Sequence, residues 1–195
     1  MRIEEVREIL HAKYAGMELV PIRYADLVFE QRVRLKCFYC KNYGEKWTCP
    51  GLAPKMDYQG IISEYANMAV VKNVWKEPLR AKTEQAGDAA EYQREGKEQD
   101  GIAVAYRRVG KELHEALLYM EKELFVRGYP LAVSFIGGYC DWCAEGCAKD
   151  KCRHPESARV PWDATGCNVV QSLANIGINV TFNGTEVCRH GLLLW

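Results

Sequence analysis

The nine cysteines are the residues of this 195-residue chain whose type and spacing could do chemistry. Seven of them fall in two short stretches that lie far apart along the chain. Reduced cysteines that cluster in this way usually bind metal through their thiolate sulfurs. An odd number leaves one cysteine over in any fully paired disulfide scheme, and a chain of this length does not need disulfides for stability. Metal–thiolate chemistry is therefore the first expectation.

The second stretch is the more specific of the two. Its ligands follow one another with growing gaps, in the order Cys140-x2-Cys143-x3-Cys147-x4-Cys152, and Arg-His-Pro comes directly after them. Bacterial ferredoxins use comparable runs that end in Cys-Pro. Structural zinc sites more often use two ligand pairs separated by a longer spacer. The spacing favours a four-iron, four-sulfur (4Fe–4S) cluster, and zinc is the alternative.

The first stretch has only three cysteines, Cys37, Cys40 and Cys49. Three thiolates hold a four-iron cluster if a remote residue, water or a substrate caps the fourth iron. The candidates for a fourth protein ligand are Cys167, Cys188 and, less favoured, His154 and His190. Without such a ligand the open iron would be a Lewis acid that binds a substrate. Both arrangements remain open at this point.

A substrate at this first site would need acid and base groups, for which His154, Tyr43 and Lys36 are candidates. A third hypothesis is a small thiol oxidoreductase that uses Cys37 and Cys40. It is the weakest, because a long loop separates this pair from the next expected helix. The sequence has no Cys-x3-Cys-x2-Cys motif and no nucleotide-binding motif, so radical cleavage chemistry is not expected.

The charge balance restricts the partners. Lys and Arg number 26 and Asp and Glu number 26, and the isoelectric point is near 6.9. No basic field exists to attract nucleic acid or an anionic membrane surface. No apolar run approaches the ~18 residues of a membrane span, and the N-terminal residues do not resemble a signal peptide. We expect a cytoplasmic protein whose partners are a redox protein, ferredoxin-like or a reductase, and a small-molecule substrate.

Apolar periodicity indicates which elements position the cysteines. Helices are expected at residues 2–13, 57–65, 102–127 and 163–176. Strands or extended segments are expected at residues 19–22, 31–36, 68–75, 131–136, 180–182 and 192–195. The alternation predicts one α/β domain over residues 1–195, with a mixed sheet of about four to five strands packed with helices. Two cluster loops, 37–54 and 137–155, each follow a strand and could lie close in space, and residues 80–100 form an exposed polar segment.

The cysteine stretches and their surroundings resemble the domain of unknown function 2284 family of predicted metal-binding proteins. The matching stretches include VFEQRVRLKC at residues 28–37 and GGYCDWCAEGCAKDKCRHP at residues 137–155. The resemblance implies that both cysteine sets hold metal, that the metal is of the iron–sulfur type, and that the source is an anaerobe. This chain departs from the family pattern in a short first spacing, in Cys-Pro-Gly where Cys-Pro-Pro is usual, and in Cys167-Asn168.

Together these observations predict an iron–sulfur redox protein with two 4Fe–4S clusters. One cluster, on Cys140, Cys143, Cys147 and Cys152, would relay electrons. The other, on Cys37, Cys40 and Cys49, would carry an open iron for substrate binding or reduction, as in an oxidoreductase or reductase. The alternative is a non-enzymatic zinc protein with a structural or interaction role.

Overall fold

The computed structural model describes residues 1–75, 101–181 and 187–195. The expected polar segment 80–100 lies outside the described residues. The helices are α1 (Ile3–Tyr14), α2 (Gln31–Phe38), α3 (Tyr58–Ser63), α4 (Gly101–Val126) and α5 (Val169–Asn175), with short 3₁₀ turns η1 (Tyr24–Asp26) and η3 (Asp163–Thr165). The strands are β1 (Glu18–Pro21), β2 (Met68–Val74), β3 (Val133–Phe135) and β4 (Cys188–Leu194).

The strands form one four-stranded sheet in the order β1-β2-β4-β3. The prediction of an α/β domain with a sheet packed with helices is confirmed. Every pairing is antiparallel, however, so the sheet is antiparallel rather than mixed. The strands β2 and β3, which precede and follow α4 in the chain, run in the same direction. In the sheet, however, β4 lies between them and runs opposite to both.

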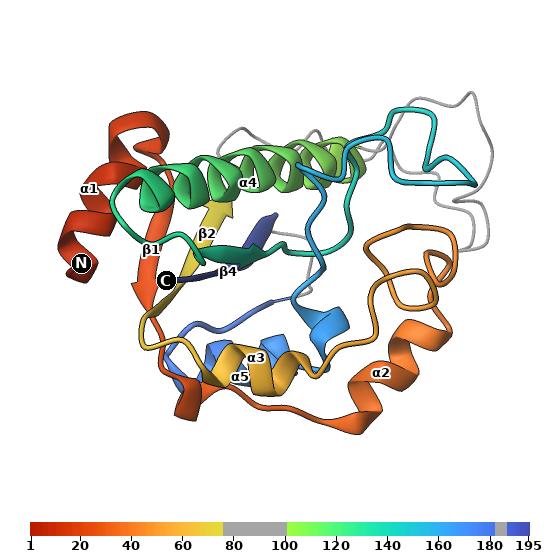
Figure 1. Cartoon of the computed structure of the whole chain (residues 1–195), viewed down its shortest axis with the longest axis horizontal. Helices are drawn as coiled ribbons and strands as arrows, with labels where there is room; N and C mark the ends of the chain where they lie inside the picture. Colours follow the sequence, from red (N-terminus) through yellow and green to blue (C-terminus); the bar gives the residue numbers. More distant parts are fainter. Residues whose placement is uncertain (76–100, 182–186) are drawn as a thin grey trace.

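Helices cover both faces of this sheet (Figure 1). On β2, Ala69 and Val71 face the apolar cluster formed with α1 and α4, whereas Met68 and Val70 face the cluster formed with α3 and α5. Successive residues of a strand point to opposite faces, so a sheet covered on both sides needs apolar residues at almost every position. This explains why β2 and the end of β4 read as unbroken apolar runs in the sequence.

The strand expected at residues 31–36 is wrong, because these residues lie in α2. Their alternation of polar and apolar residues fits a strand over such a short window. None of the α2 side chains is buried, however, so no neighbouring layer selects the strand. Arg, Leu, Lys and Gln favour a helix when packing does not decide. The first cysteine loop therefore follows a helix, and only the second follows a strand.

The helix expected at residues 163–176 is divided into η3 and α5. Gly166 stands between them with a φ of 92°, in the left-handed region that favours glycine. Asn168 then begins α5, because its side chain accepts a hydrogen bond from the backbone N–H of Gln171. The strand expected at residues 180–182 is also wrong for Val180 and Thr181, which adopt no regular structure. Phe182 lies outside the described residues.

His190 on β4 gives the fold a dependence on pH. The residue is 8% exposed, and burial, with a smaller effect of Lys72, lowers its pKa to about 4. In the unfolded chain this histidine has an ordinary pKa of about 6.5, so between about pH 6.5 and about pH 4 it is protonated in the unfolded state but not in the native state. Stability should therefore be lost as the pH falls from about 6.5 to about 4, by about 3 kcal/mol at most.

Urea unfolding at pH 7 and at pH 4.5 would measure this loss. His190→Gln removes the titrating group, so its free energy of unfolding should fall less on acidification than that of the original protein. The cysteine sites are the same in both proteins, so their contribution cancels in the comparison. Equal losses in both proteins would show that His190 does not govern the acid response.

Candidate functional site

The two cysteine loops lie at the same end of the molecule, away from both chain termini (Figure 1). Two hydrogen bonds join them directly. The indole Nε1 of Trp47 donates to the carbonyl oxygen of Ala148 at 2.8 Å. The ammonium Nζ of Lys46 donates to the carbonyl oxygen of Cys140 at 3.0 Å. The expectation that the two loops meet in space is confirmed.

The four cysteines of the second loop line one small cavity: Cys140, Cys143, Cys147 and Cys152. Trp47, Trp142 and His154 also line it. Cys140 is buried, and burial raises the pKa of its thiol. The neighbouring thiols of Cys147 and Cys152 add to this increase. A bound metal cation reverses this preference, because it stabilises the thiolate.

The same cavity contains a buried hydroxyl that interacts with a cysteine of the first set. Thr48, from the first loop, contributes to its wall and is 6% exposed. Within the described residues its Oγ1 atom has no hydrogen-bond partner. It nevertheless lies close enough to the Cys49 thiol of the first set to lower the pKa of that group, so a weak interaction with sulfur partly satisfies it. Four soft sulfur donors and one hydroxyl fit a metal–thiolate group.

The first set, Cys37, Cys40 and Cys49, lines a second cavity. Burial raises the pKa of the Cys37 thiol to about 11 and that of Cys49 to about 12. The Asp163 carboxylate and the Cys40 thiol contribute to both increases. The empty space here is about 680 Å³, against about 330 Å³ at the four-cysteine cavity. The first site therefore has room for a small molecule beside a metal.

Asp163 is a residue of this first cavity that the sequence analysis missed. It begins η3 and lines the cavity with the three cysteines. Asp163 is an exposed residue, although partial desolvation by the surrounding protein raises the pKa of its carboxyl. Asp163 lies more than a hundred residues from Cys49, and the contact between α2 and η3 helps to bring it to the site. In the sequence, Asp163 is marked by its position after Pro161-Trp162, at the start of a helical turn, which does not indicate a role at the cysteine site.

The two outlying cysteines do not line either cavity. Cys167 is fully buried in the apolar cluster beneath the sheet, and its Sγ atom lies 3.3 Å from the hydroxyl of Ser172. Cys188 begins β4, where it is paired with Val74 of β2. The acid and base candidates are divided between the sites, since Lys36 and Tyr43 line the first cavity and His154 lines the second.

Lys46 is a cation shared by the two sites. Its ammonium lies 4.8 Å from the centre of the Tyr139 ring and 3.9 Å from the carboxylate of Asp141. Its charge lowers the pKa of both Cys49 and Cys140, against the larger effect of burial. A positive charge at this position favours thiolates and other negative charge in both cavities.

The geometry disfavours a thiol oxidoreductase that uses Cys37 and Cys40. Reactive cysteines usually lie at a helix N-terminus, where the helix dipole stabilises the thiolate. Cys37 lies in the last turn of α2, where the dipole has the opposite effect. Its raised pKa has the same consequence, because it leaves little thiolate at neutral pH.

Neither cavity holds ligand atoms that already converge on a single point. Among the described residues, no group of three or more Cys, His, Asp or Glu side chains is arranged to hold one metal ion. The thiols of each set instead surround their cavity. The described helices also include none that is long and apolar enough to cross a membrane.

An antiparallel sheet covered by helices, with two cysteine-lined cavities at one end, defines a cysteine-rich α/β domain of the metal-binding class. The chain belongs to the DUF2284 family of predicted metal-binding proteins, whose model matches residues 20–195. This confirms the resemblance on which the expectation of metal binding partly rests. No curated protein and no solved structure matches the chain.

Proposed function

We propose that this protein is an iron–sulfur redox protein with two 4Fe–4S clusters. The observation that supports the proposal is that each cysteine set lines its own cavity and that one cation, Lys46, lowers the thiol pKa of a cysteine in each set. A cubane cluster offers a separate iron to each thiolate, so its ligands surround a volume rather than converge on one ion. Zinc instead requires all four sulfurs at about 2.3 Å from one point.

At the second site, Cys140, Cys143, Cys147 and Cys152 would hold a cluster that relays electrons. The buried hydroxyl of Thr48 would donate a hydrogen bond to it, and Trp47 and Trp142 would exclude water. Hydrogen bonds to cluster sulfurs and exclusion of solvent both tune the reduction potential.

At the first site, Cys37, Cys40 and Cys49 would hold three irons, and the Asp163 carboxylate would face the fourth. An oxygen ligand is a weaker partner for iron–sulfur chemistry than a thiolate, so a substrate could displace it. The larger cavity gives such a substrate room, and Lys36 and Tyr43 are the polar groups at hand for proton transfer.

A redox partner protein is part of this proposal. Cys40 is exposed, and the rings of Phe38 and Tyr39 beside it are 56% and 75% exposed. Exposed aromatic residues of this kind are enriched where proteins bind one another. Electrons would enter or leave on this side of the first site.

Metal analysis of anaerobically purified protein tests the proposal directly. We expect a coloured protein with broad visible absorption, about eight irons per chain and a matching amount of acid-labile sulfide. The visible absorption should weaken on reduction with dithionite. A colourless protein that holds one or two zinc ions and no sulfide would overturn the proposal in favour of a structural zinc protein.

A further inference from the structure

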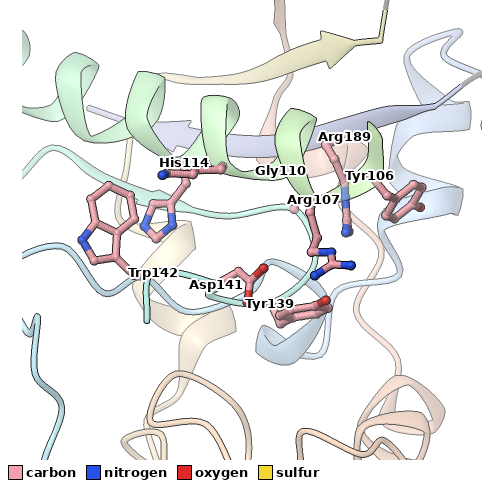
Figure 2. A pocket seen from close by; sticks show the side chains of 10 residues that line it. Tyr106, Arg107, Gly110, His114, Tyr139, Asp141, Trp142 and Arg189 are labelled. Atoms are coloured by element: carbon pink, nitrogen blue, oxygen red, sulfur yellow. The ribbon is translucent and has the colours of Figure 1, made fainter. Parts of the chain in front are cut away.

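A third cavity lies between the two cysteine sites and is lined by cations. Arg107 and Lys111 reach it from α4, where they are four residues apart and so lie on the same face of the helix. Arg189 reaches it from β4. The only acidic residue in its lining is Asp141, whose carboxylate already lies near the ammonium of Lys46. Figure 2 shows Arg107 extending from α4 toward the segment with Tyr139 and Asp141.

The fold makes a specific space for Arg189. Its guanidinium lies 3.9 Å from the centre of the Tyr106 ring, a cation–π contact. Gly138 lies against it, and a Cβ atom there would come within 2.1 Å of Nη1. Gly110 lies on the helix beside it, where a Cβ atom would be 3.7 Å from Nε. That distance is an ordinary van der Waals contact, so the Gly110 backbone packs closely beside the guanidinium.

Arg189 is also a buried cation that forms no close ion pair among the described residues, although the carboxylates of Asp163 and Asp141 favour its charge from a longer distance. Its Nε atom is buried and has no hydrogen-bond partner among the described residues. No ion pair joins its guanidinium to a carboxylate in the part of the chain that the structure describes. Removing an arginine from water without a partner is expensive, so such a residue is expected to meet an anion.

We propose that this cavity binds a small molecule with a carboxylate or phosphate group, held by Arg189, Arg107 and Lys111. The planar fork of arginine matches the oxygens of both groups. The cavity is narrow, so it suits a small anion of a few heavy atoms at its mouth and is too small for a nucleotide. The proposal does not depend on which metal fills the cysteine sites.

The position of this cavity gives the bound anion a role. Tyr139 lines both this cavity and the three-cysteine cavity, and Trp142 lines both this cavity and the four-cysteine cavity. An anion held by Arg189 therefore lies next to both metal sites. This is where the charged end of a substrate would anchor while its other end reaches toward the open space at the first site.

Isothermal titration calorimetry on anaerobically purified protein tests the proposal with two probes, malonate and inorganic phosphate. We expect at least one probe to bind, and the tighter of the two identifies the preferred group. Arg107→Gln and Lys111→Gln should each weaken that binding about tenfold, as expected for a lost charge-assisted hydrogen bond. Both side chains are exposed, so the fold should tolerate these changes.

Lys122→Gln is the matched control. It removes the same charge from the same exposed helix surface, about 16 Å further along α4. Its affinity for the probe should equal that of the original protein. Equal weakening in Lys111→Gln and Lys122→Gln would reduce the effect to net charge and overturn the proposal, as would the absence of binding by both probes at millimolar concentration.

Arg189→Lys separates this site from the metal sites. It keeps the charge but removes the Nε donor, so it should weaken probe binding while the metal content stays the same. If it instead lowers the metal content and leaves probe binding unchanged, Arg189 serves the first cysteine site, and the proposed anion site is wrong. Metal content measured on every variant keeps this result distinct from a failure of the iron–sulfur proposal.

Discussion

Replacing Cys147 by alanine should remove one of two clusters and leave the other in place. Cys147 lines the four-cysteine cavity, and its thiol interacts with that of the buried Cys140. The three remaining thiolates would need another ligand for the fourth iron, as Asp163 is proposed to be at the first site, but among the described residues no carboxylate and no further thiol lines this cavity. We therefore expect the iron content to fall by about half, from about eight to about four per chain, with sulfide falling in parallel.

Cys167→Ala is the control for this experiment. Its thiol is fully buried in the apolar cluster around Trp162 and Leu173, and it lines neither cavity. It behaves as a small apolar side chain, so its loss should leave iron and sulfide unchanged. Equal iron losses in both variants would mean that folding rather than ligation governs the content. An unchanged content in Cys147→Ala would remove the four-cysteine site from the proposal.

The apolar pattern of the sequence was enough to predict most of the architecture. The long helix α4 is predicted almost to its ends, because its buried residues recur at helical spacing over about five turns. Strand β2 and the end of β4 are predicted because a sheet covered on both faces leaves a continuous apolar run, whereas the polar first half of β4 is not predicted. The helix α2 is wrongly predicted as a strand because none of its side chains is buried, so its sequence has no apolar face with helical spacing.

The direction of the sheet could not be predicted in the same way. Alternating strands and helices indicate that β2 and β3 run parallel to one another across α4, and they do. That β4 inserts between them depends on contacts between residues far apart in the sequence. Gly191 is one such contact, because a Cβ atom there would come within 2.6 Å of Leu117 on α4.

In the candidate site too, local features can be predicted from the sequence and long-range contacts cannot. The cysteines could be found from spacing, since each set is local in the chain. Lys46 and Asp163 could not be found in this way. Lys46 affects Cys140 through a contact between loops, and Asp163 meets Cys37 through the packing of α2 on η3. A single charged residue in a loop carries no signal of this kind in one sequence.

Asp163 is the residue on which the character of the first site depends. It lines the cavity of Cys37, Cys40 and Cys49, whereas Cys167 and Cys188 do not. Asp163→Ala should therefore change the electron paramagnetic resonance signal of one reduced cluster and leave the signal of the other unchanged. Asp163→Cys should restore a stable signal, because a thiolate holds the fourth iron more firmly than a carboxylate does.

Asp150→Asn is the matched control, because Asp150 is an exposed carboxylate on the second cysteine loop and lines neither cysteine cavity. Its spectrum should equal that of the original protein. A small molecule that competes for the fourth iron should perturb the original protein more than Asp163→Cys, because a thiolate is harder to displace. If Asp163→Ala keeps both signals while Cys188→Ala changes one, the fourth ligand is Cys188, and the first site is closed to substrate by a thiolate.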